Sequence, residues 1–423
     1  MPSSFLHKFL RKLASAIALF MMCGAPGVAN AEAERAQFVI GERHVVHSEI
    51  LGAERGLWVR VPASYASSKE YRRYPVLYVL DGNLFFHPFT GVVRQLSTDV
   101  TPLIPEMIVV GIDSLDRLKD STPTQSLIGP DGKESPVWQA SGGAEAFQQF
   151  LEAELIPYVD REFSTSDYRV LAGYSLTGLP VVHNLLTRPN VFDSHIVLDG
   201  SIWWDQFHIL DLARQSIAEE TFNYNQLVVV TTEQRYPAPY ITVEAGGREL
   251  VNLLHEAAPT GLSVSHFELE KETHHNLAAI GLYRALAKMF DGHMMTLDQL
   301  YSQPEEIELQ FAALSERLGS KFAPPEGVLN FFGYQFLRNL PEQELDKALL
   351  FFSMNTRYYP DSPNAWASLG EAYQDASRKV DARQAYSEAL RLDQGNRKAA
   401  KGMAAIRAEE EELGGSSIPR SRD

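Results

Sequence analysis

Short apolar runs alternate with longer amphipathic stretches between residues 38 and 290. The runs are rich in Val, Ile, Leu and Tyr, which is typical of strands buried on both faces of a sheet. This alternation predicts an α/β fold with a mostly parallel central sheet covered by helices on both faces. GLWVRVP (56–62) alternates by twos, so we expect an antiparallel hairpin at the sheet edge. We expect further strands over 74–80, 106–112, 168–173, 195–200, 226–232 and 264–270, and helices over 144–163, 176–186 and 241–256.

The pattern changes after Asp291, where the strand signal ends. Residues 296–319 are charged and have a helical pattern. APPEG (323–327) interrupts this pattern and marks a boundary, after which a repeat of 34 residues begins. Two repeats are fewer than a free-standing array needs, so we expect them to pack on the α/β domain or on another chain. The repeat aligns Ala348, Phe352 and Pro360 with Ala382, Tyr386 and Gln394, and its second copy opens with Trp366, Leu369, Gly370 and Tyr373, in the tetratricopeptide spacing.

The first 31 residues have the character of a secretory signal peptide. A basic start (Lys8, Arg11, Lys12) precedes the apolar run 13–23, and Ala29-Asn30-Ala31 fits a cleavage site. Cys23 offers a lipidation site as an alternative, but Met22 before it is bulky for that purpose. We therefore expect a periplasmic or secreted protein. The expected segments are a signal peptide (1–31), an α/β domain (32–293), a helical linker (294–325), tetratricopeptide-like repeats (326–412) and a disordered tail (413–423).

Charge and cysteine content narrow the class of protein. The net charge of −16 becomes −19 without the three basic residues of the signal peptide, which argues against a nucleic-acid partner. The single cysteine lies inside the expected signal peptide, so we expect no disulfide and no thiol chemistry in the exported chain. We see no second apolar run of membrane-spanning length.

RVLAGYSLTGLPVV (169–182) places Ser175 between an apolar run and a helical pattern. A nucleophile elbow needs this strand–turn–helix context, because the sharp turn lifts the serine hydroxyl above the carboxyl edge of the sheet. Glycines two positions before and two after the serine let strand and helix approach. Gly173 meets the first need, but Thr177 occupies the second position and Gly178 comes one residue late. Ser175 is thus either a nucleophile or a structural serine in a turn.

A serine nucleophile needs a histidine base and a carboxylate that orients it. His274 follows the last expected strand and is our choice of base, with its neighbour His275 as the rival. Glu233 follows the preceding strand and is our choice of acid; its alternative is a surface glutamate. Glu244 and Glu249 are rival acids within a helical pattern. Two adjacent histidines do not easily chelate one ion, so we expect no metal site there.

An oxyanion hole needs two backbone N–H groups aimed at the developing charge. The residue after the nucleophile, Leu176, supplies one of them. The other should come from a loop after an early strand, and Asp81-Gly82-Asn83 ends such a strand. Gly82 permits an unusual turn, so we expect Asn83 to offer its N–H.

The motifs together resemble the putative-esterase family of α/β-hydrolases, which includes S-formylglutathione hydrolases, mycolyltransferases and ferric-siderophore esterases. The resemblance covers residues 40 to 290 and, more weakly, the repeats. The matching segments are YPVLYVLDGNLFF, MIVVGI, DSTPT, FLEAELIPYVDREF, LAGYSLTGL, SIWWD and THHNLAAIGLYRAL.

This resemblance implies an α/β-hydrolase fold with Ser175 as nucleophile, His274 as base and Glu233 as acid. It also implies that Asn83 and Leu176 form the oxyanion hole. Trp203 and Trp204 follow the strand after the nucleophile, so they either line the substrate site or pack in the core, and Tyr174 is assigned to the substrate site with them. The chain departs from the family pattern Gly-His-Ser-x-Gly-Gly at the elbow and has Asn276 where a serine often stands.

We therefore expect an exported serine esterase that acts through an acyl-enzyme on a small-molecule carboxylic ester, with a siderophore ester as one candidate. This chemistry needs no cofactor. The alternatives are a non-catalytic binding or scaffold protein that uses its repeats for a protein partner, and an enzyme that transfers the acyl group to an acceptor other than water.

Overall fold

The computed structural model describes residues 37–219, 221–233, 242–339 and 344–415. The expected signal peptide with Cys23 and the end of the expected tail lie outside the described residues. Among the residues described, no helix combines the length and the apolar character needed to span a membrane.

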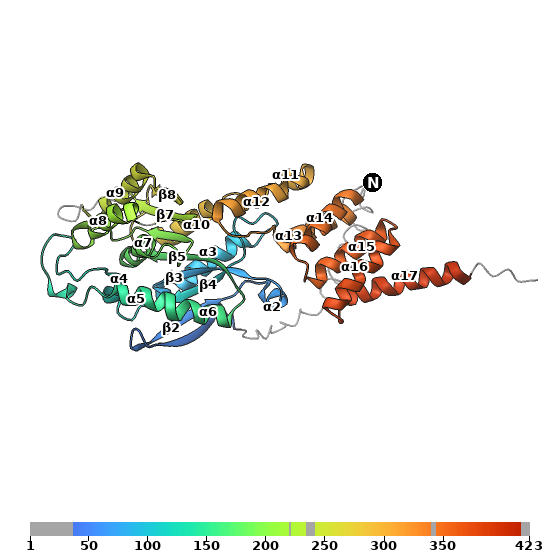
Figure 1. Ribbon diagram of the computed structural model, residues 1–423, viewed down its shortest axis with the longest axis horizontal. Helices are drawn as coiled ribbons and strands as arrows, with labels where there is room; N and C mark the ends of the chain where they lie inside the picture. Colours follow the sequence, from blue (N-terminus) through green and yellow to red (C-terminus); the bar gives the residue numbers. More distant parts are fainter. Residues whose placement is uncertain (1–36, 220, 234–241, 340–343, 416–423) are drawn as a thin grey trace, which may run out of the picture. The chain divides into compact units, whose positions relative to one another are not determined.

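A sheet forms the centre of the α/β portion (Figure 1). It has eight strands in the order β1-β2-β4-β3-β5-β6-β7-β8. The first two strands pair antiparallel, β2 pairs antiparallel with β4, and every later pair is parallel. The expected edge hairpin and the mostly parallel sheet are therefore confirmed. The strands are β1 (Glu42–Ser48), β2 (Ala53–Arg60), β3 (Tyr74–Leu80), β4 (Ile108–Ile112), β5 (Thr165–Tyr174), β6 (Ser194–Leu198), β7 (Asn225–Thr232) and β8 (Leu262–Leu269).

Strand β3 shows why the apolar runs form the centre of the fold. All seven of its residues are buried, and successive side chains point to opposite faces. Leu77 and Val79 pack into one hydrophobic core, whereas Tyr78 and Leu80 pack into the other. A strand with two buried faces must be apolar at nearly every position, which explains the unbroken run.

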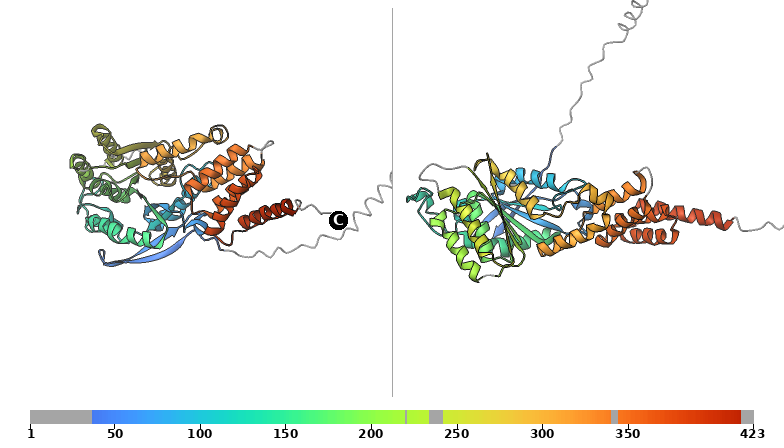
Figure 2. Two further views of the ribbon diagram at one scale, coloured as in Figure 1. Left: turned by 45° about the vertical axis from the view of Figure 1, so that its right-hand side comes forward. Right: turned by 90° about the horizontal axis from the view of Figure 1, so that it is seen from above.

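Helices cover both faces of the sheet, as the view from above shows (Figure 2). One core packs α3 and α10 against the sheet, and the other packs α5 to α9. The expected helix over 144–163 is interrupted by a π-helical turn, Leu151–Leu155, just before Pro157. The helices of this portion are α2 (Tyr65–Ser68), α3 (Gly82–Ser97), α4 (Arg117–Ser121), α5 (Ala144–Phe150), α6 (Ile156–Glu162), α7 (Gly178–Thr187), α8 (Trp204–Glu219), α9 (Thr242–Ala257) and α10 (Leu277–Met289).

The chain after residue 293 is helical throughout its described elements, and it shares a core with the α/β portion. The ring of Phe322 packs edge-on against Tyr168 of β5 and against Phe290, and all three belong to one continuous hydrophobic cluster. Leu329 and Phe332 of the expected repeat region belong to the same cluster, so this region packs on the α/β domain, the first of the two expected alternatives; packing on another chain stays a prediction. Its helices are α11 (Leu297–Ser302), α12 (Ile307–Leu318), α13 (Glu326–Tyr334), α14 (Leu345–Tyr358), α15 (Pro363–Asp375), α16 (Lys379–Leu392) and α17 (Arg397–Gly415).

The helix pair α15–α16 explains the small residues of the repeat. Gly370 lies against the ring of Tyr386, and a Cβ at this glycine would come within 2.6 Å of that ring. Ala382 and Ala389 are fully buried in the same cluster. These contacts fit a tetratricopeptide-like pair, although the assignment to that repeat class stays a prediction. Helix α17 extends to Gly415, beyond the expected end of the repeats at residue 412.

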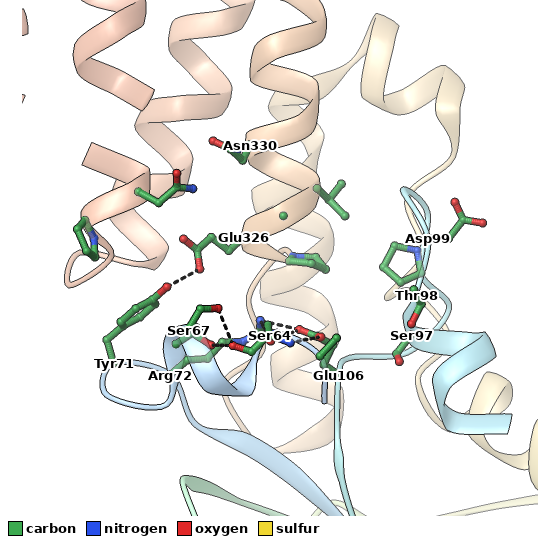
Figure 3. Close-up of a pocket in the computed structure, with 18 of the residues that line it drawn as sticks. Ser64, Ser67, Tyr71, Arg72, Ser97, Thr98, Asp99, Glu106, Glu326 and Asn330 are labelled. Atoms are coloured by element: carbon green, nitrogen blue, oxygen red, sulfur yellow. Dashed lines mark hydrogen bonds and ion pairs between the residues drawn. The ribbon is translucent and has the colours of Figure 1, made fainter. Parts of the chain in front are cut away.

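A cavity of about 690 Å³ lies where the helical region meets the α/β portion (Figure 3). On one side, Arg72 pairs with Glu106 at 2.8 Å. Across the junction, the Tyr71 hydroxyl donates to Glu326 of α13 at 3.1 Å. The bond from Tyr71 to Glu326 therefore joins the two regions by a polar contact, in addition to their shared apolar core.

Candidate active site

Ser175 lies on a sharp turn between β5 and α7, as a nucleophile elbow requires. Strand β5 ends at Tyr174, Ser175 has a left-handed backbone (φ 57°), and a short 3₁₀ helix (Ser175–Thr177) leads into α7. Gly173 makes this turn possible, because a Cβ there would lie 2.1 Å from the carbonyl oxygen of Thr177. The strand–turn–helix context expected from the sequence is thus present.

Gly178 provides the close approach of helix and strand that the sequence could not assign, because Thr177 occupies the usual glycine position of the elbow. A Cβ at Gly178 would lie 2.8 Å from the Cα of Gly200, which follows β6. The glycine that comes one residue late therefore lets α7 approach the neighbouring strand. Thr177 does not point into this contact; its hydroxyl bonds to the backbone N–H of Tyr174 and to Asp81.

Ser175, His274 and Asp199 form a continuous hydrogen-bonded chain. Nε2 of His274 lies 3.0 Å from Ser175 Oγ, and Nδ1 lies 2.6 Å from Asp199 Oδ2. The carboxylate can only accept, so Nδ1 carries the proton and Nε2 of the neutral ring is left to accept from the serine hydroxyl. The side chains of His274 and Asp199 are 16% and 12% exposed, so the pair is largely shielded from water. This arrangement prepares Nε2 to take the serine proton.

The expectation that Glu233 orients His274 is wrong in this structure. Glu233 is exposed at the end of β7, whereas Asp199 follows β6 and reaches the imidazole. Its rivals Glu244 and Glu249 lie within α9. The sequence did contain a signal for Asp199, because HIVLDG places an aspartate directly after a buried strand, next in order after the strand of the serine.

The loop between β8 and α10 presents His274 and turns its neighbour away. His275 is exposed, and its ring meets that of His274 edge-on. The side chain of Asn276 accepts a hydrogen bond from the N–H of Thr273 at 2.7 Å, which closes the turn that carries both histidines. The asparagine that departs from the family pattern thus has a local structural role.

Tyr174 contacts the base directly. Its ring stacks on that of His274, with centroids 4.9 Å apart and an angle of 27° between the planes. Its hydroxyl donates to the backbone carbonyl of His274, and its ring also meets Phe85 of α3 edge-on. The structure therefore places Tyr174 as a support for the base; a contact with substrate stays a prediction.

The two segments expected to form the oxyanion hole are joined to each other. Asn83 lies in the first turn of α3, where N–H groups have no partner within the helix. Leu176 lies in the 3₁₀ turn after Ser175. Thr177 Oγ1, next to Leu176, lies 3.0 Å from Oδ2 of Asp81, which precedes Gly82 and Asn83. The direction of the two N–H groups toward a bound ester stays a prediction.

The tryptophans assigned to the substrate site belong to the core. Trp204 is fully buried, and its indole N–H lies 3.2 Å from the hydroxyl of Thr124. Trp203 is 9% exposed, and both rings pack edge-on against Trp138. Large aromatic side chains buried this completely stabilise the fold. A contact of either tryptophan with substrate stays a prediction.

Three non-glycine residues with a left-handed backbone stand at the ends of neighbouring strands. Asp81 (φ 55°), Ser175 (φ 57°) and Asp199 (φ 47°) follow β3, β5 and β6 directly. L-residues adopt this conformation at a cost, and such residues cluster at functional sites. Each strand thus turns sharply at the same edge of the sheet and places a side chain there.

Known proteins are similar to this chain in sequence and in fold. Residues 48–252 match the family described as "Putative esterase". The ferri-bacillibactin esterase BesA of Bacillus subtilis (strain 168) is 31% identical over 227 residues, which cover 50% of this chain and 78% of that protein. The siderophore enterobactin esterase of Emericella nidulans is 32% identical over 154 residues, which cover 34% and 51%.

A solved structure extends the likeness beyond the α/β portion. The IroE-like serine hydrolase from Shewanella oneidensis has a TM-score of 0.69 and 28% sequence identity, covering 75% of this chain and 99% of that one. The BES protein from Bacillus cereus has a TM-score of 0.51 at 26% identity, covering 60% and 98%. Given the match to BesA over most of its length and the shared α/β-hydrolase architecture, this chain belongs to the esterase family whose model it matches.

Proposed function

We propose that the protein is an exported serine esterase that hydrolyses a carboxylic ester through an acyl-enzyme. One observation carries the proposal: Ser175, His274 and Asp199 lie in hydrogen-bond contact, in the order nucleophile, base, orienting acid. Membership of an esterase family supports the reaction class. The elbow geometry supports Ser175 as the attacking group, because it raises the hydroxyl at the sheet edge where the other two side chains meet it.

In the proposed reaction, Ser175 Oγ attacks the ester carbonyl while Nε2 of His274 takes the hydroxyl proton. Asp199 holds the protonated ring and stabilises its charge. The backbone N–H groups of Asn83 and Leu176 stabilise the oxyanion. The alcohol then leaves with the proton from His274, and the acyl group stays on Ser175. Water, deprotonated by His274, attacks the acyl-enzyme and releases the acid and the free serine.

The relatives support a siderophore ester as the substrate class. BesA acts on ferri-bacillibactin by its name, and three further relatives are named as siderophore or salmochelin esterases. Their matches cover half of this chain at most, so the substrate preference of this protein is a proposal. The apolar start at residues 13–23 after a basic segment supports export, which brings the enzyme to esters outside the cytoplasm.

Three variants and a covalent label test the proposal. The protein without residues 1–31 should hydrolyse p-nitrophenyl butyrate, and Ser175→Ala should lower kcat by roughly 10⁴-fold or more. His274→Ala should lose a comparable factor, whereas His275→Ala, a change at the exposed neighbour, should stay within about threefold of the parent. A fluorophosphonate should label Ser175, identified by peptide mass spectrometry. Turnover that survives in Ser175→Ala would exclude the proposed nucleophile.

Hydrolysis and acyl transfer share the same acyl-enzyme, and product analysis separates them. With methanol added to the assay, a hydrolase that admits water releases mainly the free acid. A methyl ester as the main product at low methanol concentration would instead indicate an acyltransferase.

A further inference from the structure

Thr177 stands two residues after the proposed nucleophile, at a place where the family pattern has glycine. Its side chain is buried, and its hydroxyl contacts two parts of the site. We propose that Thr177 is a positioning residue: its hydroxyl, bonded to Asp81, holds the two segments of the oxyanion hole at a fixed separation. This inference rests on the proposed function and adds a role that the triad does not include.

The hydroxyl of Thr177 bridges the ends of two strands. It accepts a hydrogen bond from the N–H of Tyr174, the last residue of β5, at 3.0 Å. It lies 3.0 Å from Oδ2 of Asp81, which follows β3, and 2.9 Å from the carbonyl oxygen of Tyr174. A hydroxyl has one proton to donate, and a carboxylate is the stronger acceptor. The proton therefore goes to Asp81, and the bond runs from the elbow to the neighbouring loop.

Asp81 is the fixed end of this bond. Its side chain is fully buried, and a buried carboxylate must be paired and hydrogen-bonded. Ser114 Oγ donates to it at 2.5 Å, and Nε of Arg117 at 2.9 Å. Nη2 of Arg117 donates in turn to the carbonyl of Tyr174 at 3.1 Å, which forms a second bridge between the same two strand ends.

The bridged segments are those that carry the two expected N–H donors. Asp81 lies two residues before Asn83, and Thr177 directly follows Leu176. Gly82 packs against the backbone of Gly111 in β4, where a Cβ would come within 2.5 Å, so this segment has no room to move toward β4. Oxyanion donors must lie about 2.7–3.1 Å from the charged oxygen. The charged oxygen forms only in the transition state. A bond that fixes the separation of the two donors therefore stabilises the transition state and not the bound ester.

The isosteric pair Thr177→Val and Thr177→Ser isolates the hydroxyl. Valine keeps the branched shape and removes the bridge, whereas serine keeps the bridge. With p-nitrophenyl butyrate, Thr177→Val should lower kcat by roughly 10- to 100-fold and leave KM within about twofold, since a misplacement of about 1 Å costs this much. Thr177→Ser should stay within about threefold of the parent. Binding of phenylboronic acid, whose serine adduct carries a negative charge, should weaken in Thr177→Val by a factor similar to the loss in kcat.

Arg117→Gln tests the second bridge at a side chain that is 36% exposed, and it carries the test if Thr177→Val does not fold by circular dichroism. It should also lower kcat at constant KM. If the parent is active, either of two results would overturn this inference and leave the proposed function intact: full kcat in a folded Thr177→Val, or equal losses of kcat in Thr177→Val and Thr177→Ser. If Thr177→Val does not fold, full kcat in Arg117→Gln would overturn the inference in the same way. A parent that neither turns over esters nor reacts with a fluorophosphonate overturns the proposed function, and this inference with it.

Discussion

Asp199 Oδ2 lies 2.6 Å from Nδ1 of His274, and it reaches the ring from the end of β6, the strand beside that of Ser175. We expect Asp199→Asn to lower kcat by roughly 10³- to 10⁴-fold, because an amide can present its N–H to Nδ1 and favour the wrong tautomer. The assay is steady-state ester hydrolysis at pH 7.

Glu233→Gln is the matched control for this change. Glu233 is exposed, and the same assay should give a kcat within about twofold of the parent. A large loss in Glu233→Gln together with an active Asp199→Asn would contradict the assignment.

Removing the hydroxyl of Tyr174 should loosen the loop that carries the base. Tyr174→Phe keeps the ring stacked on His274 but deletes the bond to its backbone carbonyl. We expect the free energy of unfolding to fall by about 0.5–1.5 kcal/mol, since one hydrogen bond is lost. We also expect kcat to fall by roughly 3- to 10-fold, because the imidazole is held less firmly. Tyr224→Phe, at a side chain that is 51% exposed, is the control and should leave both quantities unchanged.

Two glycine-to-alanine changes should shift stability in opposite directions. Gly178→Ala forces a Cβ to 2.8 Å from the Cα of Gly200, so α7 must move away from β6. We expect a loss of about 1–3 kcal/mol in the free energy of unfolding. Gly91 lies in the exposed interior of α3 with open space around its Cβ position, so Gly91→Ala should gain about 0.5–1 kcal/mol. Urea unfolding followed by circular dichroism measures both, and equal signs would refute the packing account.

Acid should destabilise the junction between the α/β portion and the helical region through His293. Burial lowers the pKa of His293 to about 4, and its Nδ1 is 3.0 Å from the carbonyl oxygen of Pro102. An unfolded histidine has a pKa of about 6.5, so the unfolded chain binds the proton more readily and stability is lost as the pH falls from about 6.5 toward 4.

The variant His293→Gln removes this titration and provides the comparison. Its unfolding free energy should fall by about 2 kcal/mol less than that of the parent between pH 7 and pH 5. The other buried histidines, such as His183 and His195, titrate equally in both proteins and cancel in the comparison. Identical pH dependence in the two proteins would show that His293 does not contribute.

The strands of the sheet could be predicted closely because burial on both faces leaves a continuous signal. The run 74–80 coincides with β3 at both ends, and the run 226–232 begins one residue after the start of β7. Hydrophobic periodicity is a local property of the chain, so it needs no knowledge of which strand lies next to which. The elbow could be predicted for the same reason, since strand, turn and helix follow one another directly.

The acid could not be predicted with the same success, because its choice depends on the geometry of the sheet. Asp199 and Glu233 both follow buried strands, and strand ends of a parallel sheet meet at one edge. Only the side-chain direction set by the turn at Asp199 brings a carboxylate to the imidazole. Chain order alone favours the later strand, which carries Glu233. The resemblance to the family assigns the same residue and contains no information on the direction of its side chain.

Thr177 shows a second limit of reading the elbow from its pattern. A β-branched residue at a glycine position suggests crowding, whereas the side chain points toward Asp81 and makes a bond there. The close approach of helix and strand is instead met by Gly178 and Gly200. A sequence pattern records which residue types stand near a turn, but not which way each of them faces.

The contorted turns after β3, β5 and β6 imply a trade-off between durability and chemistry. Glycine at position 81, 175 or 199 would relax the chain locally, by up to about 1–3 kcal/mol at each place. Each such replacement would also delete a carboxylate or the hydroxyl on which the proposed reaction depends. Selection for stability alone would therefore favour replacements at these three positions. A laboratory search for thermostable variants of this enzyme should hold them constant.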